Sequence, residues 1–164
     1  MPGITKNLED YRAKPYPEAS EMDQLTDLTS FFCFKLSIAV SSLLPALFQQ
    51  TYFGKELKGK VVEDALQEAF RATLNIADLM GLELPQPEDI DQAMCLISEE
   101  IASDTFLSLT KSQADVFDIA SFVWEDLQGD LGTLSEEDQH DLESVVGELF
   151  FDIHLLAMQF DIDI

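Results

Sequence analysis

Basic residues are nearly absent from the second part of this 164-residue chain. Residues 72–164 carry 22 Asp and Glu side chains and a single cation, Lys111, whereas residues 1–71 carry eight Lys and Arg against ten acids. The formal net charge is −23. Because phosphate backbones are bound through clustered Lys and Arg, this charge argues against direct binding of nucleic acid. It favours a solvated acidic surface, cation binding or attraction to a basic protein partner.

Cysteine and glycine are also scarce, and their placement excludes several kinds of site. Cys33 and Cys95 lie in apolar stretches without CxxC spacing or a neighbouring histidine, so we interpret both as reduced and buried. No glycine-rich phosphate loop and no nucleophile elbow occurs in the sequence. The surroundings of His140 and His154 predict a surface histidine and a core histidine rather than catalytic bases.

The N-terminal segment lacks the hydrophobic core of a secretory signal, which predicts a cytoplasmic protein. Residues 1–20 contain Pro2, Pro15 and Pro17 and are expected to form an extended leader. The apolar run FFCFKLSIAVSSLLPALF, residues 31–48, has only 18 residues and includes Lys35. We therefore expect a buried helix there and no membrane partner.

Apolar residues recur at helical spacing through the rest of the chain, and no window shows sustained strand alternation. The sequence predicts one all-α domain over residues 21–164, a bundle of about five helices. Pro45 is expected to kink or interrupt the first helix, and a turn near Thr110–Ser112 to separate the third from the fourth. Ser135 is the predicted N-cap of the fifth, with Asp138 three residues on. The expected helices cover residues 21–50, 56–82, 88–109, 112–127 and 135 onward. Gly81 and the prolines that follow it are expected to end the second helix.

A weak internal repeat relates two of these helices at an offset of 80 residues. Residues 61–84 set over residues 141–164 give four identities, and both segments end in a short apolar-acidic-apolar tail. We expect a bundle made of two similar helical pairs. The matched positions are Glu63 with Glu143, Glu68 with Glu148, Phe70 with Phe150 and Ala77 with Ala157.

The stretch SEEIASDTFLSLTKSQADVFD, residues 98–118, contains a candidate metal site. Glu100 and Asp104 are four residues apart, and Asp115 and Asp118 are three apart, so each pair lies on one face of its helix. If the two helices run antiparallel, the pairs face each other and could hold Mg²⁺ or Mn²⁺, which take oxygen ligands. The alternative is that these acids form the solvated faces of two helices.

The same stretch resembles the MazG-type all-α nucleoside triphosphate pyrophosphohydrolases, whose hallmark is EExxE on one helix and ExxD on the next. Glu99 and Glu100 match the first pair, whereas Ser103 stands where the third glutamate is expected, with Asp104 beside it. SQADVFDIA, residues 112–120, is similar to the family's alanine-aspartate-valine run. DALQEAFRATLNIADLMGLELP, residues 64–85, is similar to its second motif helix, with Glu68 in the place of an aspartate.

The resemblance implies hydrolysis of a nucleoside triphosphate between its α- and β-phosphates, assisted by Mg²⁺ or Mn²⁺. Lys111 would contact a phosphate. Phe122 and Trp124 would stack on a base or cover a dimer interface, and we expect a homodimer because helical bundles expose apolar faces that pairing covers. The implied metal ligands are Glu99, Glu100, Asp104, Asp115 and Asp118.

A rival hypothesis is a non-enzymatic acidic helical protein that binds a basic partner, in the extreme case by imitating DNA. Its basis is the charge imbalance of residues 72–164. It predicts salt-sensitive binding without a metal requirement. The enzyme hypothesis predicts instead divalent-dependent nucleotide binding that is lost when Glu100 or Asp115 is removed.

Overall fold

The computed structural model describes the helical part of the chain. It covers Tyr16, Met22, residues 25–55, 59–85, Asp89, residues 102–125, residues 134–162 and Ile164, with the side chains of residues 25–27, 51, 102–103 and 123–124 outside the description. Over this part there are four helices and no strand: α2 (Leu25–Phe53), α3 (Lys60–Met80), α5 (Ala102–Glu125) and α6 (Glu136–Gln159). The all-α prediction is therefore confirmed for the described residues.

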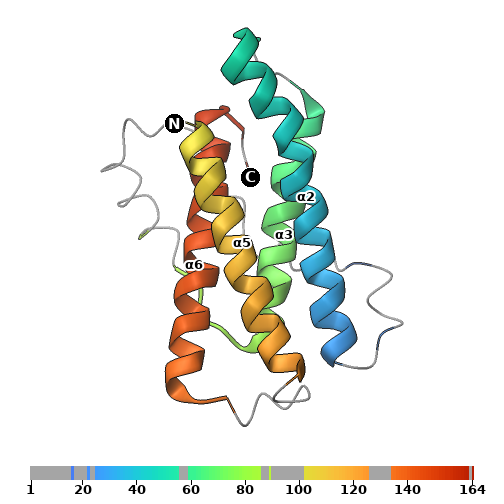
Figure 1. Ribbon diagram of the computed structural model, residues 1–164, viewed down its shortest axis with the longest axis vertical. Coiled ribbons are helices and arrows are strands. Elements are labelled where there is room, and N and C mark those ends of the chain that lie inside the picture. Colours follow the sequence, from blue (N-terminus) through green and yellow to red (C-terminus); the bar gives the residue numbers. More distant parts are fainter. Residues whose placement is uncertain are drawn as a thin grey trace.

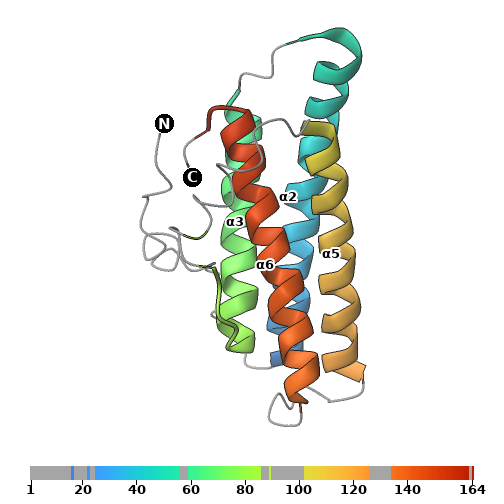
Figure 2. The ribbon, with the colours of Figure 1, turned by 90° about the vertical axis from the view of Figure 1, so that its left-hand side faces the viewer.

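The four helices form a bundle in which every pair of neighbours is antiparallel (Figure 1). α2 and α6 run in one direction along the long axis, and α3 and α5 run in the other. The neighbours are α2 with α3, α3 with α6, α6 with α5, and α5 with α2. α2 and α6 are consequently diagonal to each other, as Figure 2 shows.

α5 is one continuous helix, so the expected turn near Thr110–Ser112 was wrong. Residues 102–125 contain neither glycine nor proline, and buried side chains continue through the expected break at Leu109, Ser112 and Val116. The Thr110 hydroxyl donates to the carbonyl of Phe106 at 2.9 Å, which satisfies this polar side chain inside a helix. α5 therefore covers the end of the third predicted helix and nearly all of the fourth, and the described residues form four helices rather than five.

The helix ends follow the sequence signals. α3 ends at Gly81, whose φ of 66° lies in the left-handed region that glycine adopts without steric cost, and the Leu82 amide donates to the Ala77 carbonyl at 2.9 Å. The Ser135 hydroxyl accepts from the Asp138 amide at 3.1 Å, which confirms the predicted N-cap of α6. Pro45 does not interrupt α2, which runs through it to Phe53.

The core lies between the four helices and is built mainly from leucine, alanine and valine, with a few phenylalanine rings. The rings of Phe70 on α3 and Phe150 on α6 lie 4.9 Å apart between centroids. His154 packs against both, and its Nδ1 lies 2.7 Å from the Phe150 carbonyl, which confirms a core histidine. Phe70 and Phe150 are matched positions of the weak repeat, but the repeat itself stays a prediction.

Tyr16 is the part of the N-terminal segment that the structure describes, and it is buried against the bundle. Its ring contacts Phe31 at 5.4 Å and Phe32 at 5.8 Å, centroid to centroid. The Lys35 ammonium lies 5.2 Å and the Arg71 guanidinium 5.8 Å from the same ring. Cation–π attraction adds to apolar burial here, so Tyr16 attaches this point of the chain to α2 and α3.

α2 includes a stretch, Leu28–Gln50, that is long and apolar enough to cross a membrane, with a mean hydropathy of 1.8. It is the only such stretch among the residues described, and 39% of an apolar 18-residue segment within it is buried in the bundle. The core helix of a soluble protein meets the same criterion, so length and composition alone do not identify a span. The expected absence of a membrane partner stays a prediction.

Candidate functional site

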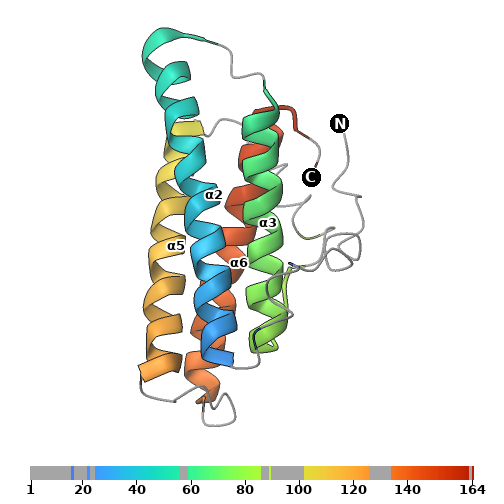
Figure 3. The same ribbon diagram turned by 90° about the vertical axis from the view of Figure 1, so that its right-hand side faces the viewer.

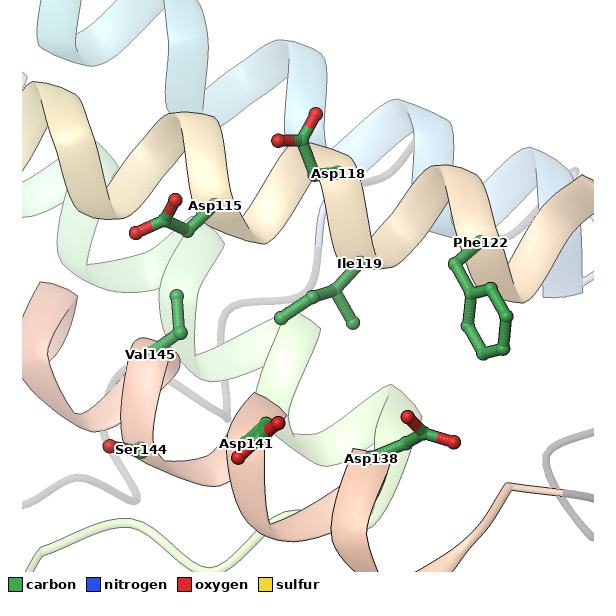
Figure 4. Close-up of a pocket in the computed structure, with 8 residues that line it drawn as sticks. All are labelled: Asp115, Asp118, Ile119, Phe122, Asp138, Asp141, Ser144 and Val145. Carbon is green, nitrogen blue, oxygen red and sulfur yellow. The ribbon is translucent and has the colours of Figure 1, made fainter.

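A groove of about 480 Å³ lies between α5 and α6, and four aspartates line it (Figure 4). Asp115 and Asp118 come from α5, and Asp138 and Asp141 come from α6. Within each helix the two aspartates are three residues apart, so they share one face. Because α5 and α6 are antiparallel neighbours, the two pairs border the same groove from opposite sides.

The floor of the groove is apolar. Ile119 on α5 and Val145 on α6 are half-buried between the two rows of carboxylates, and Phe122 lies at one end (Figure 4). The Ser135 hydroxyl donates to the Asp138 carboxylate at 2.6 Å, so the cap that starts α6 also orients one rim residue. The groove therefore combines an apolar strip with an acidic rim.

The four carboxylates point in different directions rather than toward one centre. In Figure 4 the Asp118 side chain points away from α6, and Asp115 and Asp138 lie toward opposite ends of the groove. Across the described residues there is no cluster of three or more His, Cys, Asp or Glu side chains with the arrangement of a metal site. A hard cation needs several oxygens around one point, so the rim as it stands suits several separate cationic groups better than one ion.

The continuous α5 changes the geometry expected for the acidic stretch. Asp104 and Asp115 lie eleven residues apart on the same helix, which at 1.5 Å per residue separates them by about 16 Å along its axis. The expectation that Asp104 faces Asp115 and Asp118 across two antiparallel helices is therefore wrong. Glu99 and Glu100 lie outside the described residues, and their role as ligands stays a prediction.

Of the other predicted site residues, the structure describes the side chains of Lys111 and Phe122 but not that of Trp124. Lys111 is exposed on α5, one turn before Asp115, and Phe122 lines the groove. The backbone of Trp124 belongs to α5, but its side chain is outside the description. Phe122 thus lies near the predicted aspartates, as a substrate-stacking role would require, while the role itself stays a prediction.

The sequence did not indicate five of the groove residues as site residues: Ile119, Asp138, Asp141, Ser144 and Val145. The signal that could have found the two aspartates is the acidic start of α6, where Asp138 and Asp141 repeat the three-residue spacing of Asp115 and Asp118. Spacing alone does not say which helix a given face opposes. The pairing of α5 with α6 supplied that information.

Comparisons of the chain with protein-family models, with curated proteins and with solved structures give no match. The resemblance to the MazG-type group therefore rests on the quoted motif residues alone.

Proposed function

We propose that the groove between α5 and α6 is a docking surface for a basic segment of a partner protein. The observation that carries this proposal is the pairing of an apolar floor, Ile119 and Val145, with a rim of four diverging aspartates. An amphipathic helix could place an apolar side chain on the floor and Lys or Arg side chains along both rims. Each diverging carboxylate would then meet its own cation.

The charge distribution supports the same partner chemistry. Residues 72–164, which include α5 and α6, carry 22 acids and one cation. Such a one-sided field attracts basic partners from a distance and repels acidic ones, so it raises the association rate and the specificity of docking. The attraction falls as salt shortens the Debye length, from about 30 Å at 0.01 M to about 8 Å at 0.15 M.

A peptide-binding experiment tests this function. The probe is a synthetic amphipathic peptide of Lys and Leu, titrated by calorimetry into the wild-type chain and into the double variant Asp118→Asn/Asp141→Asn. We expect the variant to bind about tenfold more weakly, since each rim charge contributes of order 0.5–1 kcal/mol. The binding should need no divalent cation.

The matched control is Asp64→Asn/Glu83→Gln, which removes the same two charges from exposed positions on and after α3. A specific groove predicts a much smaller loss of affinity in this control, because only the long-range field is reduced. Equal losses in the two double variants would show that the peptide responds to net charge and not to the groove. That result would refute the proposed docking groove.

Nucleotide pyrophosphohydrolysis is the second candidate, and the specific observation in its favour is that Asp115, Asp118 and Phe122 line one groove. A volume of about 480 Å³ falls in the range of small-molecule sites. In this proposal Asp115 and Asp118 would supply oxygen ligands to Mg²⁺ or Mn²⁺ at the groove. A bound divalent ion would supply charge neutralisation of the triphosphate and an activated water.

Pyrophosphate release from a panel of ribo- and deoxyribonucleoside triphosphates tests the second candidate. The assay compares the wild type with Glu100→Ala/Asp115→Ala in Mg²⁺ and in Mn²⁺. Turnover that is metal-dependent and lost in the double variant would support hydrolysis. An absence of turnover in both metals would leave docking as the function of the groove.

A further inference from the structure

The outward face of α2 carries a straight stripe of mostly apolar residues. Its members follow one another at intervals of four, three, four, three and four residues. The mean of 3.6 equals the residues per turn of an α-helix, so they stay in line along one face. The opposite face of α2, with Leu36, Val40 and Leu43, is buried in the core. The stripe consists of Phe34, Ile38, Ser41, Pro45, Phe48 and Tyr52, all of them exposed.

None of the other described helices covers this stripe. Figure 3 views the bundle from the side on which α2 stands in front, with α3 and α5 beside it and α6 behind. The last turns of α2 also project beyond the ends of the other three helices (Figure 1). On this projecting end the ring of Phe48 contacts Tyr52 at 5.0 Å and Phe53 at 5.7 Å, centroid to centroid, so aromatic side chains cluster there.

The exposed area matches what a stable protein interface needs. Four aromatic residues of α2 have 50–72% of their surface exposed: Phe34, Phe48, Tyr52 and Phe53. At about 200 Å² for a complete aromatic side chain, they leave about 500 Å² open to solvent. In a standard interface each partner contributes roughly 800 Å². The exposed side chains of Ile38, Leu44 and Pro45 supply much of the area that the four rings leave short of this value.

The stripe is also complementary to itself when two copies cross antiparallel. Residue numbers that face each other then sum to 86, which pairs Phe34 with Tyr52, Ile38 with Phe48, and Ser41 with Pro45. Large side chains meet large ones at both ends, and the two small residues at the centre allow the helices to approach closely. We propose that this face is the interface of a homodimer, with the α2 helices of two copies antiparallel about a two-fold axis near residue 43.

Electrostatics favour a second copy in this position. Each chain carries a net charge of −23, yet α2 contains only two charged residues, Asp27 and Lys35. α6, with seven acidic residues and no Lys or Arg, lies diagonally behind α2 in the bundle (Figure 3). Pairing through α2 therefore keeps the acidic surfaces of the two copies apart, whereas pairing through α5 or α6 would press like charges together.

Pairing also gives the projecting end of α2 a place to pack. In the antiparallel arrangement the Tyr52 end of one copy lies over Phe34 of the other, where the partner's bundle provides apolar surface. An anionic membrane surface would be a poorer occupant, because a chain of net charge −23 is repelled by it. The dimer interface and the groove between α5 and α6 use different helices, so the two proposals stand independently.

Sedimentation equilibrium of the full chain tests the dimer. We expect the wild type to have twice the monomer mass of 18.4 kDa. Ile38→Glu should sediment as a monomer, with dimer affinity reduced at least about a hundredfold, because the two-fold axis places the buried charge in the interface twice. Phe48→Ser is a second variant that removes apolar surface without adding charge, and circular dichroism checks that both variants keep their helix content.

Leu107→Glu is the matched control for Ile38→Glu. Leu107 is 66% exposed on α5 and Ile38 is 63% exposed on α2, so the two changes add the same charge at equally open aliphatic positions. A dimer that survives Leu107→Glu but not Ile38→Glu supports the proposed face. A monomeric wild type, or equal loss of the dimer in both variants, would overturn it.

Cross-linking tests the orientation and the nature of the occupant. Ser41→Cys with a short bismaleimide should give covalent dimers above the wild-type background, whereas Ser121→Cys, an exposed serine on α5, should not. A final experiment, co-sedimentation with vesicles of neutral phospholipid, tests whether the face binds lipid instead of a second copy. If the wild type remains monomeric and pellets with the vesicles, the face binds lipid and the homodimer proposal fails.

Discussion

At the scale of single residues, burial decides the chemistry of the polar side chains in the core. Cys33 is 2% exposed, and desolvation raises the pKa of its thiol from 9.0 to about 11. His154 is held by the Phe150 carbonyl and by two phenylalanine rings. Both side chains are parts of the packed interior, which agrees with their interpretation from sequence as buried residues.

The pKa of Cys33 predicts slow alkylation of the native protein. In a Cys95→Ser background at about pH 8, a thiol with a pKa two units higher has about a hundredfold less thiolate than in the unfolded chain. The unfolding free energy should also fall as the pH rises from about 9 to about 11, since the unfolded chain ionises first. Labelling of the native thiol at the rate seen in denaturant would contradict this prediction.

The contact between Phe70 and Phe150 is expected to couple α3 to α6. A double-mutant cycle with Phe70→Leu and Phe150→Leu should give a coupling energy of about 0.5–1.5 kcal/mol, the usual range for aromatic pairs beyond their buried area. Urea unfolding of the four proteins measures it. Additive effects of the two changes would mean that the rings are buried side by side without stabilising each other.

At the scale of elements, the informative case is α5, which continues through Thr110, Lys111 and Ser112. Three polar residues in a row predict a turn. Thr and Ser side chains, however, oppose a helix only where they find better hydrogen-bond partners in a non-helical backbone. Here the Thr110 hydroxyl bonds within the helix, and Ser112 is buried on the core face. The continuity of α5 is what separates Asp104 from the groove.

Lys111→Pro distinguishes a continuous helix from a turn at this position. Lys111 is exposed on α5, so the change removes no core contact, but proline eliminates one backbone hydrogen bond and clashes with the preceding turn. We expect a loss of about 3 kcal/mol or more in unfolding free energy, measured with urea. Lys111→Ala serves as the control and should change stability by less than about 0.5 kcal/mol. An unfolding free energy unchanged by Lys111→Pro would support the predicted turn at residues 110–112 and contradict a continuous α5.

At the scale of the whole molecule, charge and apolar surface are distributed on different helices. α5 and α6 together carry eleven acids, whereas the stripe of α2 from Phe34 to Tyr52 contains no charged residue. A partner of opposite charge and a second copy would therefore occupy different sides of one bundle. This separation lets an acidic protein associate with itself without opposing its own charge.

Self-repulsion predicts that salt stabilises the fold. Raising NaCl from about 0.01 M to about 0.15 M shortens the Debye length from about 30 Å to about 8 Å, which screens the repulsion among a net charge of −23. We expect the melting temperature to rise by several degrees, followed by circular dichroism. Over the same range the affinity for a basic peptide should fall. A melting temperature that does not change with salt would indicate that the acids are neutralised locally.

The sequence by itself determined the helical class, the end of α3 at Gly81 and the start of α6 at Ser135, because apolar period and cap residues act within a few neighbours along the chain. It also identified Asp115 and Asp118 as one surface, since three-residue spacing places them on one face. Only the tertiary structure decided that Asp138 and Asp141 lie opposite them, and that Phe34 and Tyr52 belong to an uncovered face. Which faces meet depends on the packing of whole helices, and a local pattern does not contain that information.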